Sequence, residues 1–162
     1  MKKIFYLSLM LFSGSAFAGF SIDGIDVNNS DCSSIDNKEM STPIYFSSSN
    51  SELAFFNIKE MTFKGKSGGY LTAYCNTDNG RVLSVEVATS KEEYETTNVL
   101  LSDSYNVVSN KSDFLGDTTV YQGVDQVITL RMSRKHIYTI RVDRSSETYS
   151  DILAIKESSY QK

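Results

Sequence analysis

Residues 70–93 read YLTAYCNTDNGRVLSVEVATSKEE and contain the clearest structural signals in the chain. At their centre, Asp78-Asn79-Gly80 is a strong hairpin signal, because Asn and Gly tolerate the positive φ of tight turns. The turn separates two stretches of strand-forming residues, 70–77 and 81–88, so we predict an antiparallel hairpin. Alternation along the second strand places three apolar residues on one face: Leu83, Val85 and Val87.

The same stretch ends with the beginning of a helix. Ser90 and Glu93 have the spacing of a capping box, in which each side chain bonds the other residue's backbone N–H. Beyond it, apolar and aromatic residues recur at helical spacing: Tyr94, Leu101, Tyr105 and Val108. We therefore predict one principal helix directly after the hairpin.

The remaining chain supplies further strands on both sides of this unit. The segments with strand patterns are 20–27, 53–63, 117–121, 124–132 and 137–142, with a turn at 64–69 and a polar loop before 117. Residues 28–51 read as loop, with a short helix over 31–38 capped by Ser30 as an option; 149–158 fits helix or strand, and we favour helix. With no internal repeat or long linker, the prediction is a single α+β domain, an antiparallel β-meander sheet with one principal α-helix packed on it.

The first 18 residues have the three parts of a cleavable secretion signal. Lys2 and Lys3 precede an apolar run of about nine residues, and Ala16-Phe17-Ala18 is an A-x-A cleavage site. A membrane-spanning helix needs roughly 20 apolar residues, and no later segment is apolar enough either. We therefore expect a signal peptide over 1–18, a secreted domain over 19–162 that begins at Gly19, and a periplasmic location without a transmembrane segment.

Charge and cysteine content narrow the classes of partner. Two of the 16 basic residues and none of the 20 acidic ones lie in the signal, so the secreted part has a formal net charge of −6. An acidic surface argues against nucleic-acid binding. In an oxidising compartment, the two cysteines, Cys32 and Cys75, are expected to form one structural disulfide rather than a redox pair.

A search for catalytic or metal-binding patterns finds none, so no cofactor is expected. His136 is the only histidine, follows Arg134 and Lys135, and fits a hairpin residue better than a catalytic base. The acidic run 23–31 lacks the spacing of a calcium loop, and one His with two paired Cys cannot supply a zinc site. A hydrolase with two facing carboxylates stays open as a minor alternative, because spatial pairing is invisible in a sequence.

The distribution of charge along the chain gives the only candidate binding residues. Residues 129–144 hold one acid and a basic group: Arg131, Arg134, Lys135, Arg141 and Arg144. Residues 91–117 are acidic, beginning with Glu92, Glu93 and Glu95. Either set can be an ordinary solvated surface, or a docking patch for a partner of opposite charge.

The aromatic residues on the candidate strands have two interpretations. Core packing is favoured over an interface, because the chain has no tryptophan to fill its interior. The residues concerned are Phe55, Phe56, Phe63, Tyr70 and Tyr74.

These features favour a non-enzymatic periplasmic protein that binds another protein. One class is an immunity protein or inhibitor whose acidic patch meets a basic toxin or lysozyme-like hydrolase, since blocking needs complementarity and no chemistry. The alternative is an accessory component of a cell-envelope or secretion assembly.

Overall fold

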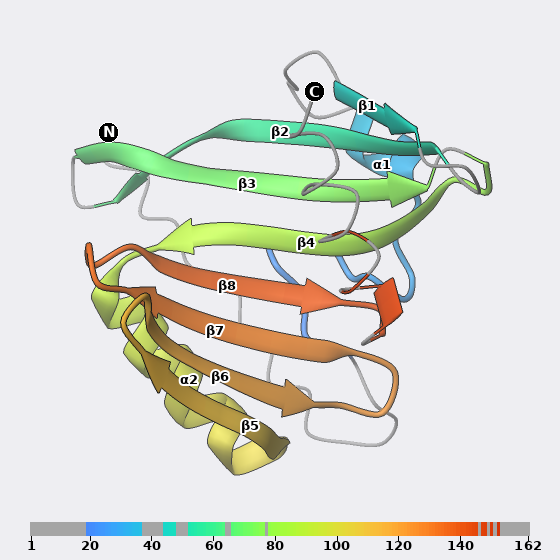
Figure 1. Cartoon of the computed structure of the whole chain (residues 1–162). Helices are drawn as coiled ribbons and strands as arrows, with labels where there is room; N and C mark the ends of the chain where they lie inside the picture. Colours follow the sequence, from blue (N-terminus) through green and yellow to red (C-terminus); the bar gives the residue numbers. More distant parts are fainter. Residues whose placement is uncertain are drawn as a thin grey trace.

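The computed structural model describes residues 19–36, 44–47, 52–63, 66–76, 78–145, 147, 148, 150 and 152, and gives the backbone alone for 34, 36, 44–47, 52–63 and 66–70. The helices with defined bounds in this part of the chain are α1 (Cys32–Asp36) and α2 (Lys91–Ser104). The strands are β1 (Ile44–Ser47), β2 (Glu52–Phe63), β3 (Lys66–Asn76), β4 (Arg81–Thr89), β5 (Asn106–Asp113), β6 (Gly116–Gln122), β7 (Val127–Ser133) and β8 (Tyr138–Asp143). They form one antiparallel sheet in the order β1-β2-β3-β4-β8-β7-β6-β5, which confirms the predicted α+β meander (Figure 1).

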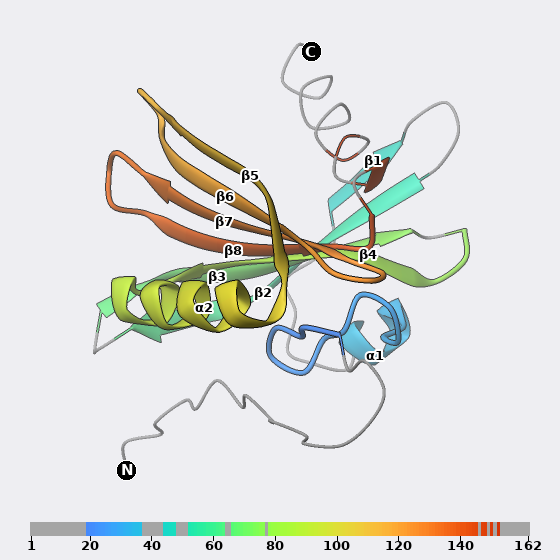
Figure 2. The ribbon, with the colours of Figure 1, turned by 90° about the horizontal axis from the view of Figure 1, so that it is seen from below.

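The sheet consists of two four-stranded meanders that meet at their last strands. Each meander follows a helix in the sequence, and β4 pairs antiparallel with β8 from Ser84↔Asp143 to Thr89↔Tyr138. Both helices lie on the same side of the sheet, towards opposite ends (Figures 1 and 2). The chain thus repeats a helix-plus-four-strands arrangement that the sequence does not reveal.

The hydrophobic core lies between the sheet and the two helices. Val85 and Val87 of β4 face Val142 and Ile140 of β8 in register, and Leu101 of α2 packs against the same cluster. Each fully buried side chain of this size contributes roughly 1.5–3 kcal/mol of transfer free energy. The predicted face of β4 is partly wrong, because a register shift between Tyr74 and Cys75 brings Val82 into the core in place of Leu83.

The predicted capping box is confirmed at the start of α2. Ser90 Oγ accepts from the backbone N–H of Glu93 at 3.2 Å, and Glu93 Oε2 accepts from that of Ser90 at 3.4 Å. The helix ends at Ser104, with Tyr105 as an extended cap, so the predicted stripe is wrong at Val108. Val108 lies on β5, where pairing with β6 fixes an extended backbone.

Local turns override two other predictions near the N-terminus. Residues 20–27 form no strand, because Asp23 and Gly24 both adopt positive φ and fold Ile22 back onto Ile25. The short predicted helix exists as α1, but Asp31 caps it by accepting from Ser33 N at 2.8 Å. Ser30 instead accepts from the backbone N–H of Asp26.

The strand predictions hold for β2, β3, β4, β6, β7 and β8, with shifted ends, and miss β1 and β5. The expected turn at 64–69 is shorter, since β3 begins at Lys66, and β7 begins only at Val127 because Gly123 N bonds Gln126 O at 2.8 Å. The predicted polar loop before 117 is instead β5, which has no buried face and is defined by pairing with β6 alone. Ser150 and Ile152 are helical, and the rest of 149–158 lies outside the described residues.

Candidate functional site

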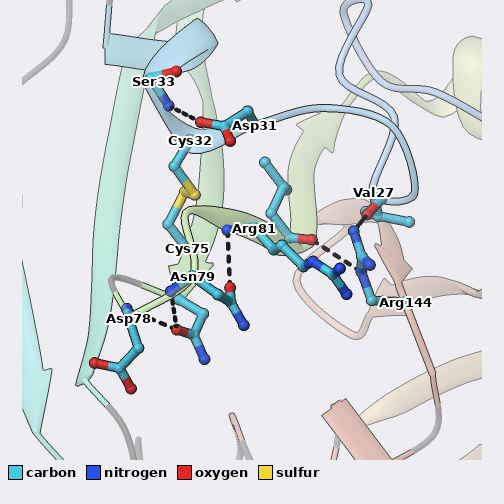
Figure 3. The surroundings of a disulfide bond; sticks show 11 residues. Val27, Asp31, Cys32, Ser33, Cys75, Asp78, Asn79, Arg81 and Arg144 are labelled. Carbon is cyan, nitrogen blue, oxygen red and sulfur yellow. Dashed lines mark hydrogen bonds between the residues drawn. A yellow bond between two sulfur atoms is a disulfide. The ribbon is translucent and has the colours of Figure 1, made fainter.

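The predicted disulfide joins α1 to the end of β3. Cys32 and Cys75 are bonded, with their Cα atoms 5.9 Å apart, and Cys75 is fully buried. The neighbouring hairpin turn is fixed as well, because Cys32 N donates to Gly80 O at 2.8 Å and Arg81 N donates to Asn79 Oδ1 at 3.1 Å (Figure 3). The bond therefore fastens the β3–β4 hairpin to α1, which fits the expected structural role.

Arg141, expected on a docking patch, is buried within the sheet. It lies on β8 with 6% of its surface exposed, and its Nη2 is 2.8 Å from Asp143 Oδ1. Its Nε donates to the same carboxylate at 2.9 Å, its Nη1 lies 3.8 Å from Glu86 Oε2, and the guanidinium sits 5.4 Å from the centre of the Tyr74 ring. Arg141 is thus a structural residue and not a surface contact.

This charged cluster faces away from the core residues of the same strands. Arg141 is in register with Thr129 on β7 and Glu86 on β4, so one polar row crosses the junction of the two meanders. Burial raises the pKa of Asp143, although the guanidinium opposes the shift. Burial also lowers the pKa of Arg141, but the carboxylates of Asp143 and Glu86 outweigh it and the net direction is upward. Asp143 is completely buried, so the two carboxylates do not form an open hydrolytic pair.

Arg144 also has a structural role, because its guanidinium binds backbone carbonyl groups. It is half-buried, its Nη2 donates to Val27 O, and its Nε donates to Val82 O at 3.3 Å (Figure 3). Burial lowers the pKa of this guanidinium. Arg144 therefore connects the N-terminal loop to β4, beside a shallow hollow of about 470 Å³.

The other three predicted basic residues lie at an exposed end of the sheet. Arg131 is near the end of β7, and Arg134 and Lys135 form the β7–β8 turn. This turn contacts the adjacent β5–β6 turn: Arg134 Nη2 donates to Asp113 O at 2.6 Å, and Arg134 N donates to Leu115 O at 3.1 Å. We call residues 113–117 and 133–137 together the hairpin tip.

Close backbone packing fixes the conformation of the hairpin tip. Gly116 has φ +143°, and a Cβ there would lie 2.0 Å from Met132 O, so no other residue fits without a shift of the backbone. His136 adopts φ +56° and donates its N–H to Ser133 O at 2.9 Å, which confirms the expected turn role. The tip is therefore held by main-chain contacts and the Arg134 side chain, and not by a buried core.

Three large apolar side chains project from the hairpin tip into solvent. Phe114 is 83% exposed, Leu115 53% and Ile137 52%. In Figure 2, β5 and β6 curve away from α2 towards their shared turn, so this end of the sheet protrudes. Clustered exposed apolar groups with a charged rim mark interaction surfaces. Sequence reasoning missed these residues, although a Phe-Leu pair between Asp113 and Gly116 puts apolar side chains in a turn, where polar ones are usual.

The three predicted acidic residues do not form a separate site. Glu93 belongs to the capping box and accepts from the hydroxyl of Thr89. Glu95 lies 3.5 Å from Lys91 one turn earlier, and Glu92 lies in the first helical turn, where the helix dipole favours a negative charge. Glu92 and Glu95 are exposed, but each has a local role.

The structure gives no sign of a metal site or a membrane-spanning helix in its described part. No three His, Cys, Asp or Glu side chains there come close enough to hold an ion. Asp26, in the acidic run 23–31, accepts from Asn28 N at 2.9 Å and from Asn29 Nδ2 at 2.6 Å. Among the same residues, no helix has the length and apolar character to cross a membrane.

Comparison of the chain with protein-family models, with curated proteins and with solved structures finds no match. Any function must therefore be inferred from the residues of the chain itself.

Proposed function

We propose that this chain is an exported, periplasmic, non-enzymatic protein that binds another protein through its hairpin tip. The observation that carries the proposal is the set of three exposed apolar side chains, Phe114, Leu115 and Ile137, on two turns fastened by Arg134. A signal peptide over residues 1–18 provides the route out of the cytoplasm.

The hairpin tip has the properties of a binding hot spot. Burying an aromatic side chain removes about 150–250 Å² from water, and such anchors contribute about 2 kcal/mol or more at interfaces. Phe114 is almost fully exposed before binding, so most of this area is available to a partner. Because main-chain contacts already order the two turns, binding costs less conformational entropy than it would for a free loop.

The shape and charge of the hairpin tip favour a concave, anionic partner surface. A protruding apolar tip fits a cleft. Arg134 and Lys135 belong to the tip together with Asp113 and Asp117, and Arg131 lies two residues before it on β7. Lys111 is paired with Asp113 at 3.2 Å and contributes less. The active-site cleft of a glycoside-cleaving hydrolase carries paired carboxylates and offers this combination. An immunity protein or inhibitor that inserts its tip into a toxin or wall-hydrolase cleft is thus the form of the proposal we favour.

The acidic residues of α2 give limited support for a contact with a basic partner. Glu93 is committed to the helix cap and Glu95 to Lys91, which leaves less free negative charge on α2 than the sequence suggests. An acidic contact with a basic partner is accordingly the secondary mode.

A second candidate function rests on the edge strand β5. Asn106–Asp113 is exposed along almost its full length, and no strand pairs with its outer edge in the described part of the chain. Such an edge accepts an added strand from another protein. Strand addition of this kind supports the alternative of an accessory component in an envelope assembly.

Affinity capture tests the proposal and separates it from the alternative. The exported protein, Phe114→Ser and Val124→Ser are immobilised and exposed to envelope extract at low and high salt. Val124 is 70% exposed in the β6–β7 turn, at the opposite end of the strands, and is the matched control. We expect a partner that Phe114→Ser loses, Val124→Ser keeps and salt weakens. Capture that is unchanged in Phe114→Ser contradicts the hairpin tip, and a stable envelope protein as the partner favours the accessory function.

A further inference from the structure

The residue at which the predicted secreted chain begins lies in a polar recess. Gly19 is half-buried, and a Cβ on it would stand 3.1 Å from Gln126 Oε1 and 3.3 Å from Asp26 Oδ1. Asn28 Nδ2 would be 3.6 Å away. Glycine therefore fits closely at this position, and its backbone lies next to two oxygen acceptors.

One of these acceptors has no hydrogen-bond donor within the described residues. Gln126 is 3% exposed, and its Nε2 donates to the hydroxyl of Tyr105 at 3.2 Å, but its Oε1 is buried without a partner there. Buried polar atoms are rarely left in this state, because the loss of their hydration is not recovered. We therefore expect a hydrogen-bond donor close to Gln126 Oε1.

The second acceptor is a carboxylate oxygen with room for another bond. Asp26 Oδ1 accepts from Asn28 N at 2.9 Å, and a carboxylate oxygen takes two such bonds. Arg144 interacts with the charge of Asp26, but its Nη2 donates to Val27 O. A cation at Gly19 would lie next to the negative carboxylate of Asp26 and the neutral amide oxygen of Gln126.

The residues after Gly19 fix its position. Phe20 packs against the core, and Ile22, Ile25 and Val27 are buried in it. The chain is therefore packed against the core from Phe20 onwards, one residue after Gly19.

We infer that cleavage after Ala18 completes the fold, because the new α-ammonium group of Gly19 is bound by Gln126 Oε1 and Asp26 Oδ1. The inference rests on the export part of the proposed function and is independent of the hairpin tip. In the cleavage, a signal peptidase adds one water to the Ala18–Gly19 peptide bond. The Ala18 carbonyl carbon takes the hydroxyl and leaves as a carboxylate, and the Gly19 nitrogen becomes an ammonium with three donors.

An ammonium fits this recess better than the peptide N–H of an uncleaved chain. The peptide N–H of the uncleaved chain is a single donor without charge, and it leaves Gln126 Oε1 without a partner. Each additional donor of the ammonium can bond an acceptor that the single peptide N–H leaves free. The processed chain should then be more stable than the uncleaved chain.

The test uses the full chain expressed with its own leader and purified from the periplasm. One version is unchanged; the other has one alanine inserted between Ala18 and Gly19, so that its processed product starts one residue earlier. Intact mass establishes where each product begins, and thermal unfolding and amine labelling follow. We expect the unchanged product to begin at Gly19, and the inserted alanine to lower Tm by about 3 °C or more. The α-amine of the unchanged product should label about tenfold more slowly than that of the extended product.

The variant Asp26→Asn supplies the control, since it keeps an acceptor for the backbone N–H of Asn28 and removes the charge, although it loses the bond from Asn29 Nδ2. In that background the inserted alanine should shift Tm by less than half as much. Equal Tm and equal labelling of the unchanged and extended products would overturn docking of the terminus. A product that retains the leader, or begins elsewhere, would overturn the processing itself and with it the export part of the proposed function.

Discussion

The guanidinium of Arg134 in the β7–β8 turn donates a 2.6 Å hydrogen bond to the backbone carbonyl of Asp113 in the β5–β6 turn, 21 positions earlier in the sequence. Together with the bond from Arg134 N to Leu115 O, this contact fastens two separate hairpins to each other. Phe114 and Ile137, both largely exposed, lie on these two fastened turns.

Replacing Arg134 should loosen the hairpin tip without unfolding the domain. In Arg134→Ala we expect faster amide hydrogen exchange at residues 113–116, while the free energy of unfolding falls by less than about 1 kcal/mol because the site is at the surface. Arg134→Lys keeps the charge but loses the planar guanidinium, so it should resemble the alanine variant. Unchanged exchange in both variants would show that Arg134 does not hold the two turns together.

Removing the buried counter-ion of Arg141 should cost much more stability. Asp143→Asn leaves the guanidinium of Arg141 without its closest partner in a buried site, and we expect a loss of about 3–5 kcal/mol in urea unfolding. The double variant Arg141→Met with Asp143→Leu should lose less, because no unpaired charge stays behind. If the single variant is as stable as the parent, the cluster does not stabilise the junction of β4 and β8.

The hairpin tip should become less ordered as the pH falls. A hydrogen bond from the backbone N–H of Leu115 lowers the pKa of Asp113, and the ammonium of Lys111 adds to the effect. Because the folded pKa lies below the unfolded one, the contribution of Asp113 is present above about pH 3.9 and is lost as pH falls through the folded pKa. An NMR titration of the Leu115 amide should show a midpoint below that of a free Asp side chain, and Asp113→Asn should show none. A midpoint at or above the ordinary value would contradict this role.

Loss of the disulfide should destabilise the junction of α1 with the β3–β4 hairpin. The closed loop spans 43 positions, and on a chain-entropy argument a crosslink of this length contributes about 4 kcal/mol. The double variant Cys32→Ser with Cys75→Ser should unfold at lower urea, and reduction of the parent should reproduce that midpoint. A parent protein whose midpoint does not respond to reductant would contradict the stabilising role.

Local signals in the sequence are sufficient for the elements that form locally. The Asn79-Gly80 turn, the Ser90–Glu93 capping box and the cysteine pair all predict contacts that the structure contains. In each case, the turn residues, the cap or the reactive side chains themselves specify the partner, so no tertiary information is needed.

The functional residues can be predicted only in part, because tertiary contacts decide which charges are exposed. Ile140 and Val142 alternate with Arg141 and Asp143 along β8, so the two pairs lie on opposite faces of the strand. Nothing in that pattern shows that the polar face is buried as well. β5 escapes prediction for the converse reason: a strand exposed on both faces has no apolar alternation to recognise.

Site-specific photo-crosslinking tests binding through the hairpin tip most directly, because it captures a partner whose identity is not known in advance. A photoreactive phenylalanine analogue is placed at position 114 in the exported full chain, or at position 124 as the control, and cells are irradiated before envelope proteins are separated. We predict one discrete adduct at position 114 and none of the same mass at position 124. An adduct of equal yield at both positions, or none at position 114 when position 124 crosslinks, would contradict binding through the hairpin tip.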